Sequence, residues 1–187
     1  MEKEIKKCVE VLGNGGTILY PTDTIWGIGC DATNSKAVGK IYKIKKRPET
    51  KNLIILVNDK KMLEHYVKEI PEITWDLMKN VEKPLTIIYP NAINLPKNLV
   101  GEDKSIAIRI VKNEFCIRLI RAFGKPIVSS SANISGEAAP LVFSCVSEYI
   151  KEKVDYVVRL YQDVLQEVKP SRIIRIKEDG DFIIIRP

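Results

Sequence analysis

The sequence predicts an α/β fold in which a twisted mixed sheet is flanked by helices. Along the 187 residues, segments with apolar side chains at helical spacing alternate with short apolar runs, which is typical of α/β proteins. The final segment predicts a hairpin, with strands over 172–176 and 182–186 joined by a turn at 178–181. Because hairpin strands are antiparallel, we expect a mixed sheet and not a purely parallel one. The length suits one domain over 1–187 that buries a sizeable core.

The N-terminal part of the chain predicts two helices. Apolar residues at helical spacing indicate a helix over 3–12, and a buried strand over 17–20 follows it. The second helix is expected over 35–44, with Asn34 or Ser35 as its N-cap.

The rest of the chain continues this alternation. Pro71 separates two helical patterns, because proline disrupts a helix interior. In 105–110, isoleucines alternate with smaller or polar residues, which places Arg109 on the face opposite the isoleucines. Helices are expected over 59–70, 71–81, 113–123 and 143–151, and strands over 53–57, 84–89, 105–110, 126–128 and 156–160.

The composition argues against several classes of site. The single histidine, His65, lies in a Lys- and Glu-rich helical pattern, which argues against a Ser-His-Asp triad and against a zinc site. The cysteines Cys8, Cys30, Cys116 and Cys145 form no CxxC pair, so we expect reduced thiols and a cytoplasmic protein. No apolar run approaches the roughly 20 residues that span a bilayer, and the charged N-terminus does not match a signal peptide. We therefore expect no membrane partner.

The positive charge is concentrated in one connector. The chain has 30 Lys and Arg against 24 Asp and Glu, and this net +6 favours anionic partners such as nucleotides or RNA. A solvated, Lys-rich surface gives the same value. Residues 45–51 (KKRPETK) place four cations between a predicted helix and a predicted strand. This is typical of a solvated helix end, but Lys45, Arg47 and Lys51 can also neutralise phosphates.

A second polar stretch follows the strand predicted at 126–128. Residues 129–136 (SSSANISG) hold four serines and one asparagine, which are also ordinary loop residues. Beside cations, these neutral donors and acceptors suit an oxygen-rich anion, with Ser131 and Asn133 fixing its orientation. Without a histidine or cysteine nucleophile, the expected chemistry is positioning and charge stabilisation. Phosphoryl and nucleotidyl transfer work in this way, with Mg²⁺ held largely by the substrate's phosphates.

Three further features have two interpretations each. The run TDT at 22–24 follows a predicted strand, where open α/β sheets bind ligands, but such residues also satisfy tight turns. The run GIGCDA at 27–32 matches a dinucleotide fingerprint only nominally, because several residues separate it from the preceding strand. Arg109 either reaches solvent or presents its guanidinium to a carboxylate or phosphate.

Five short motifs together carry a family resemblance. They are YPTDTIWGIG at 20–29, Lys45-x-Arg47-Pro48, IAIR at 106–109, Ser131-Ala132-Asn133 and Pro170-Ser171. In this order they resemble the YrdC/Sua5 family, the threonylcarbamoyl-AMP synthases, over essentially the whole chain. The resemblance implies a YrdC-like fold with a large, positively charged concave cavity. It implies a nucleotidyltransferase that condenses L-threonine, bicarbonate or CO₂, and ATP into threonylcarbamoyl-AMP and pyrophosphate, for the t6A modification of adenosine 37 in tRNA.

The resemblance also implies roles for particular residues. Lys45 and Arg47 would be catalytic, and the metal would be Mg²⁺ held by the ATP phosphates, with no protein ligands. The ATP site would comprise Lys45, Arg47, Lys51, Ser105, Ser131, Asn133 and Arg186, and the threonine site Thr24, Arg109, Ser129 and Ser171.

Two alternatives stay open at this point. A basic concave face could bind tRNA or double-stranded RNA without catalysis, in a manner that weakens steeply with salt. The chain could also resemble the carbamoyl-adenylate-forming domain of hydrogenase-maturation proteins. For a threonylcarbamoyl-AMP synthase, the downstream partner would be the machinery that transfers the threonylcarbamoyl group.

Overall fold

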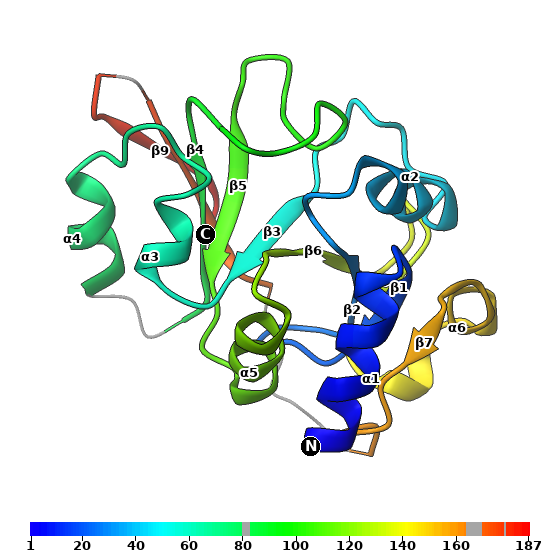
Figure 1. Cartoon of the computed structure of the whole chain (residues 1–187). Helices are drawn as coiled ribbons and strands as arrows, with labels where there is room; N and C mark the ends of the chain where they lie inside the picture. The colour runs from blue at the N-terminus through cyan, green and yellow to red at the C-terminus, as the bar shows by residue number, and fades with distance from the viewer. Residues whose placement is uncertain (80–82, 164–169, 178) are drawn as a thin grey trace.

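The computed structural model of the chain describes residues 1–79, 83–163, 170–177 and 179–187, and its strands form one twisted mixed sheet with helices packed around it (Figure 1). The strand order is β7-β1-β2-β6-β3-β5-β4-β8-β9, with both parallel and antiparallel neighbours. This confirms the predicted fold class. The strands are β1 (Thr17–Tyr20), β2 (Gly27–Cys30), β3 (Ile54–Val57), β4 (Leu85–Tyr89), β5 (Ile106–Ile110), β6 (Ile127–Ser131), β7 (Tyr156–Val157), β8 (Arg172–Ile176) and β9 (Phe182–Arg186).

Several helices begin or end at capping groups that the local sequence provides. The Asn34 side chain accepts hydrogen bonds from the backbone N–H groups of the first turn of α2, so it is the N-cap. Gly124 ends α5 in the left-handed conformation, at a φ of 75°. The helices are α1 (Glu2–Gly13), α2 (Ser35–Ile44), α3 (Lys60–Leu63), α4 (Ile73–Lys79), α5 (Glu114–Phe123), α6 (Glu148–Lys153) and the 3₁₀ helix η1 (Phe143–Cys145).

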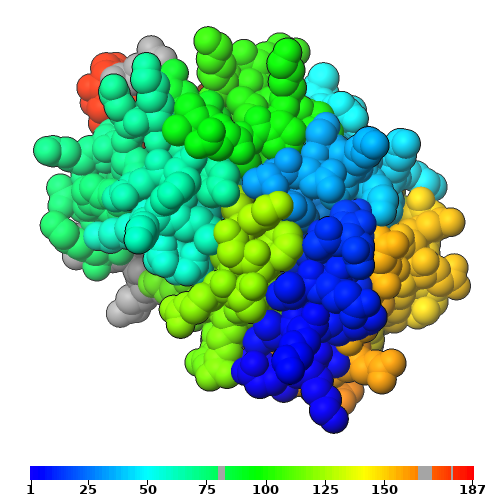
Figure 2. Space-filling view, viewed as in Figure 1, coloured from blue at the N-terminus to red at the C-terminus, as the bar shows by residue number. Residues whose placement is uncertain are grey.

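Two apolar clusters cover the two faces of the sheet. Ile18 and Tyr20 of β1 belong to the cluster under α1 and α5, whereas Leu19 between them belongs to the cluster on the other face. Figure 2 shows the surface of α1 (blue) lying against that of α5 (yellow-green). Among the described residues, no helix is long and apolar enough to cross a membrane.

Several predicted elements differ from the structure. The helix predicted over 59–70 is shortened to α3, because the backbone of Tyr66 and Lys68 hydrogen-bonds with Ile93 and Asn91 and cannot continue a helix. The helix predicted over 143–151 is divided into η1 and α6, since the Ser147 side chain caps α6. The predicted strand over 156–160 ends at Val157.

The sequence-based prediction also missed a strand and shortened another. Residues 27–30 form β2, and β6 continues beyond residue 128 to Ser131. The end of the helix predicted over 71–81 and part of the turn predicted at 178–181 lie outside the described residues.

Candidate functional site

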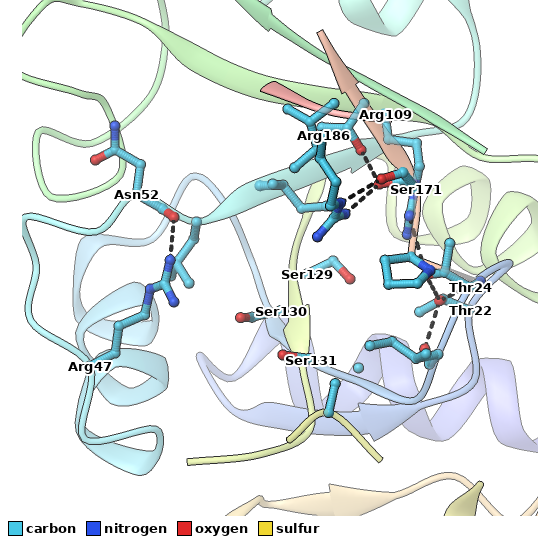
Figure 3. Close-up of a pocket in the computed structure, with 18 residues that line it drawn as sticks. Thr22, Thr24, Arg47, Asn52, Arg109, Ser129, Ser130, Ser131, Ser171 and Arg186 are labelled. Carbon is cyan, nitrogen blue, oxygen red and sulfur yellow. Dashed lines mark hydrogen bonds between the residues drawn. The ribbon is translucent and has the colours of Figure 1, made fainter. Parts of the chain in front are cut away.

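A cavity of about 300 Å³ opens where β2, β3, β5, β6 and the C-terminal hairpin come together (Figure 3). Its lining is rich in hydroxyl groups and includes three guanidinium groups. No carboxylate is among its described lining residues. The hydroxyls are those of Thr22, Thr24, Thr86, Ser129, Ser130, Ser131 and Ser171, and the guanidiniums belong to Arg47, Arg109 and Arg186.

Three of the serines on the cavity wall, Ser129, Ser130 and Ser131, are residues of β6. Ser129 pairs with Ile54 of β3, and Ser131 pairs with Gly27 of β2. The polar stretch predicted as a loop over 129–136 therefore begins inside the sheet. Because a strand fixes the direction of its side chains, these hydroxyls are held in place before any ligand binds.

The nearby glycines allow the strands to approach closely. A Cβ atom on Gly29 would lie 2.1 Å from the carbonyl oxygen of Val128, which no real side chain could tolerate. A Cβ on Gly27 would lie 3.2 Å from the Ser129 hydroxyl. Both glycines lie within β2 and not at a strand-to-helix turn, so their spacing is explained by sheet packing and not by a dinucleotide fingerprint.

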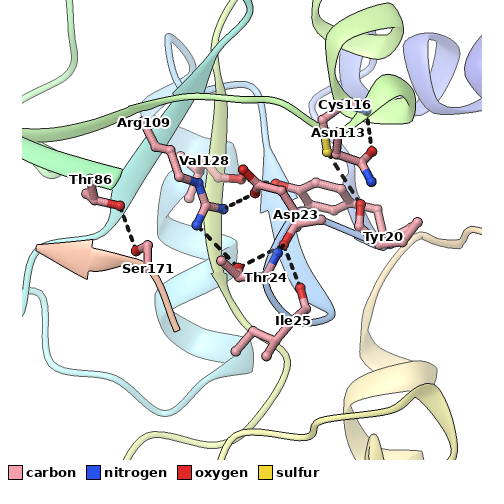
Figure 4. Close-up of polar contacts among 12 residues, drawn as sticks. Tyr20, Asp23, Thr24, Ile25, Thr86, Arg109, Asn113, Cys116, Val128 and Ser171 are labelled. Carbon is pink, nitrogen blue, oxygen red and sulfur yellow. Dashed lines mark hydrogen bonds and ion pairs between the residues drawn. The ribbon is translucent and has the colours of Figure 1, made fainter. Parts of the chain in front are cut away.

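One end of the cavity contains a buried ion pair (Figure 4). The Arg109 side chain is 3% exposed, and its Nη2 lies 3.1 Å from Oδ1 of Asp23. Its Nη1 donates to the hydroxyl oxygen of Thr24 at 3.2 Å. The strand alternation of 105–110 thus points Arg109 into the molecule beside the cavity, and of the two interpretations the structure excludes a solvent-directed arginine.

Arg186 lies above this end on the last strand. Its Nε donates to the carbonyl oxygen of Ser171 at 2.8 Å, and its Nη2 contacts the Ser171 hydroxyl at 3.3 Å. Thr86 of β4 shares a 2.8 Å hydrogen bond with the same hydroxyl. Burial, and then repulsion by Arg109, lower the pKa of Arg186.

Arg47 lies on the other side of the cavity, after the end of α2 (Figure 3). Its Nε and Nη2 donate to the backbone carbonyl oxygens of Lys51 and Asn52 at 2.8 and 2.9 Å. Burial lowers its pKa. Among the described residues no ion pair involves Arg47, so its charge faces the cavity without a carboxylate partner.

Lys45 connects the two polar stretches that the sequence singled out. Its ammonium donates to the carbonyl oxygens of Ser131 and Asn133, the latter at 2.6 Å, while its own carbonyl accepts from the N–H of Ser135. The side chain is buried, and this burial, followed by repulsion from Arg47, lowers its pKa to about 8. The Lys-x-Arg and Ser-x-Asn motifs are therefore brought together.

The predicted site residues divide into two groups. Thr24, Arg47, Arg109, Ser129, Ser131, Ser171 and Arg186 all line the one cavity. Lys45, Lys51, Ser105 and Asn133 are outside its lining.

Within the second group, the side chains of Ser105 and Asn133 form hydrogen bonds with nearby residues, and Lys51 is exposed. The Ser105 hydroxyl donates to Asp103 at 2.6 Å, and the Asn133 amide donates to the carbonyls of Ile134 and Glu137.

Sequence reasoning did not single out every residue of this cavity. Asn52, Thr86 and Ser130 line it without having been predicted, and Asp23 was not predicted as the partner of Arg109. Thr86 carried a usable signal, because it is the one small hydroxyl residue within the apolar strand predicted over 84–89.

Comparison with known proteins gives the family. The Sua5/YciO/YrdC family model, described as telomere recombination, matches residues 10–187. The chain belongs to this family. The predicted resemblance is thereby confirmed.

Named relatives in the Sua5/YciO/YrdC family are similar over most of their length. The chain is 35% identical over 160 residues to the threonylcarbamoyl-AMP synthase of Pseudoalteromonas translucida (strain TAC 125), covering 84% of this chain and 86% of the relative. It is 32% identical over 177 residues to the threonylcarbamoyl-AMP synthase of Acinetobacter baumannii, covering 91% and 92% of the two chains.

A solved structure shows the same architecture. The structure of P. abyssi Sua5 complexed with L-threonine superposes with a TM-score of 0.91 at 29% identity. The superposition covers 100% of this chain but 54% of that Sua5, so this chain spans just over half of the solved protein.

Proposed function

We propose that the chain is an L-threonylcarbamoyladenylate synthase. The observation that carries this proposal is the cavity itself, where Arg109 with its carboxylate partner and Arg47 without one lie on opposite sides of a wall of serine hydroxyls. An α-amino acid and a triphosphate require such different surroundings. The two relatives named threonylcarbamoyl-AMP synthase support the assignment.

Threonine would bind at the Arg109 end. The guanidinium of Arg109 is directed at the cavity and would pair with the threonine carboxylate. The hydroxyls of Thr24, Ser129 and Ser171 surround this position and would hold the remaining polar atoms. The L-threonine bound in the P. abyssi structure supports threonine as the ligand.

The phosphates of ATP would bind at the Arg47 end. Arg47 carries an uncompensated charge there, and the Ser131 hydroxyl lies on the same wall. Lys45 donates to the carbonyls of Ser131 and Asn133, so it fixes the backbone beside the nucleotide and supplies a second positive charge. Arg186, Lys51, Ser105 and Asn133 complete the proposed nucleotide site.

Mg²⁺ would enter as part of the substrate. The described lining offers hydroxyls and guanidiniums but no carboxylate, and the described residues contain no cluster of three His, Cys, Asp or Glu side chains that could hold a metal. A hard cation prefers charged oxygen ligands, which the phosphates of Mg–ATP provide.

The reaction follows from this arrangement. The threonine amine adds to CO₂ and loses a proton, which gives a carbamate. A carbamate oxygen attacks the α-phosphorus as the bond to the bridging oxygen breaks, and pyrophosphate leaves. Arg47 and Lys45 would stabilise the charge that develops on the phosphates, while Arg109 holds the carbamate in line.

The fate of the product is part of the same proposal. Threonylcarbamoyl-AMP would be consumed in the cytoplasm by machinery that transfers the threonylcarbamoyl group to adenosine 37 of tRNA. Contact of this chain with tRNA is consistent with its net charge of +6.

Pyrophosphate release tests the proposal. The chain is incubated with Mg–ATP and bicarbonate, with and without L-threonine, and we expect release that depends on threonine. An RNA-binding module without catalysis would release none. A carbamoyl-adenylate-forming enzyme would use carbamoyl phosphate and ignore threonine, and either result would refute the assignment.

A further inference from the structure

Asp23 is a buried carboxylate to which the proposed reaction gives no role. Its side chain is 7% exposed and does not line the cavity. Among the described residues, neither of its carboxylate oxygens has a hydrogen-bond partner, so its negative charge is balanced by the ion pair with Arg109. A carboxylate is costly to bury, and this one is buried against the arginine that would bind the substrate.

The hydroxyl groups beside this ion pair have a defined direction of donation. Thr22 Oγ1 lies 2.7 Å from the carbonyl oxygen of Ile25, which can only accept, so Thr22 donates its one proton there. Thr22 Oγ1 lies 3.0 Å from Thr24 Oγ1, and because the Thr22 proton is used, Thr24 must be the donor. Arg109 in turn donates to Thr24.

The consequence is that Thr24 can offer a ligand only a lone pair. Its single proton is directed at Thr22, and one of its two lone pairs accepts from Arg109. A ligand group that meets Thr24 must therefore be a donor. An amino group or the N–H of a carbamate fits this requirement, whereas a second carboxylate oxygen does not.

We propose that Asp23 is a positioning residue that makes the Arg109 end of the cavity selective for a zwitterionic α-amino acid over an anion that lacks the amino group. The inference rests on the proposed function and extends it to the basis of substrate choice. The charges of Asp23 and Arg109 cancel, so this end, where Arg186 also lies, attracts a polyanion less than two unpaired guanidiniums would. The substrate carboxylate contacts Arg109, and the substrate N–H donates to Thr24.

The ion pair of Asp23 with Arg109 also directs threonine and ATP to different ends of the cavity. Arg47 keeps an uncompensated charge, so the triphosphate is attracted to its side. Asp23 makes the Arg109 side less attractive to the phosphates, because its carboxylate lies 3.1 Å from that guanidinium and offsets its charge.

The test is the substitution Asp23→Asn in the full chain, with Asp31→Asn as the matched control. Asp31 is equally buried, with a side chain 6% exposed, and pairs with Lys125 at 3.0 Å, but it does not line the cavity. We expect Asp23→Asn to raise the KM for threonine about tenfold or more and the KM for ATP less than about threefold. Asp31→Asn should leave both constants within about twofold of the unsubstituted chain.

Inhibition by a threonine analogue without the amino group gives a second measurement, which would not change if the role of Asp23 were only structural. In 3-hydroxy-2-oxobutanoate a carbonyl oxygen, which can only accept a hydrogen bond, replaces the amino group of threonine, so the compound is an anion and not a zwitterion. With Asp23 removed, inhibition by this anion should strengthen relative to threonine binding. The inference would be overturned if Asp23→Asn changed the KM for threonine and the inhibition constant of the competitor by the same factor. It would also be overturned if the KM for threonine in Asp23→Asn equalled that in Asp31→Asn.

A second variant decides the case in which Asp23→Asn does not fold. Thr22→Val removes the acceptor of the Thr24 proton at almost constant volume, so Thr24 can donate to the carbonyl oxygen of the competitor, and discrimination against 3-hydroxy-2-oxobutanoate should fall. Undiminished discrimination in Thr22→Val overturns the inference. If the unsubstituted chain shows no threonine-dependent pyrophosphate release, the proposed function and this inference both fail. If it does and Asp23→Asn behaves like the control, only the inference fails.

Discussion

Arg109 and Arg47 line one cavity but lie in opposite electrostatic surroundings. Arg109 is buried in the sheet against the carboxylate of Asp23 and the hydroxyl of Thr24. Arg47 is half-buried within the connector of residues 45–51, and its guanidinium donates to the backbone carbonyls of Lys51 and Asn52. The role of a guanidinium therefore depends on which groups neutralise its charge. The paired arginine can bind a zwitterion specifically, and the unpaired one can bind a polyanion strongly.

The largest expected effect is on stability at the paired end. Arg109→Ala leaves the buried Asp23 without a counter-charge, and we expect the free energy of unfolding to fall by about 3–5 kcal/mol. Arg47→Ala should lower it by about 1–2 kcal/mol, because only hydrogen bonds to carbonyls are lost. Urea unfolding of both variants measures the difference. Equal losses would show that the two arginines are not held differently.

The next effect is on catalysis at the unpaired end. Arg47→Ala removes the charge that would stabilise the leaving pyrophosphate, so kcat/KM for ATP should fall about 100-fold or more with the fold retained. The control is Lys43→Ala, which removes the same charge from an exposed position on α2 and should change kcat/KM less than about twofold. Retained activity in Arg47→Ala would contradict its proposed role.

A smaller effect concerns pH and Lys45. With a pKa of about 8, Lys45 loses its proton as the pH rises above that value, so kcat/KM for ATP at saturating threonine should fall by about tenfold per pH unit. The pH profile of kcat/KM for ATP measures this for the threonine-bound protein. A profile that stays flat up to pH 9.5 would mean that the Lys45 charge is not needed.

Stability should respond to pH in the opposite direction. The folded pKa of Lys45, about 8, lies below the model-compound value of 10.5, so the folded chain binds fewer protons than the unfolded chain between these values. The contribution of Lys45 to the free energy of unfolding therefore rises from pH 8 to 10.5. Lys45→Met should abolish that increase, and an unchanged increase in this variant would assign it to another group.

The smallest expected effect is that of salt. Arg47 is more accessible than Arg109, so its interaction with phosphates should be screened more strongly. Raising the ionic strength from about 0.05 to 0.5 M should increase the KM for ATP several-fold and the KM for threonine less than about twofold. Equal increases would indicate that both substrates bind at similarly exposed charges.

Short sequence patterns predicted the helices and strands that are stabilised by residues close to them in the sequence. The helices α1, α2 and α5 follow from apolar spacing, α2 and α5 also from their caps, and the C-terminal hairpin follows from its two isoleucine-rich runs. β2 was missed because its sequence, GIGC, has few strand-forming residues. Gly29 is explained by the close approach of the Val128 carbonyl, and Val128 is distant in sequence.

The sequence predicted which residues line the candidate site better than it predicted how their side chains pair. The residue types at Arg47, Ser131 and Arg109 indicated an anion site, and the structure places them on one cavity. The pairing of Asp23 with Arg109 joins residues 86 positions apart, so no local pattern could indicate it. The direction of the Lys45 ammonium, toward two backbone carbonyls, depends likewise on how β6 ends beside α2.

A crystal structure of the chain with L-threonine and an ATP analogue that cannot release pyrophosphate tests the central claim most directly. We expect the threonine carboxylate within hydrogen-bond distance of Arg109, the threonine nitrogen in contact with Thr24, and the triphosphate in contact with Arg47. A triphosphate bound to Arg109, or threonine bound at Arg47, would contradict it.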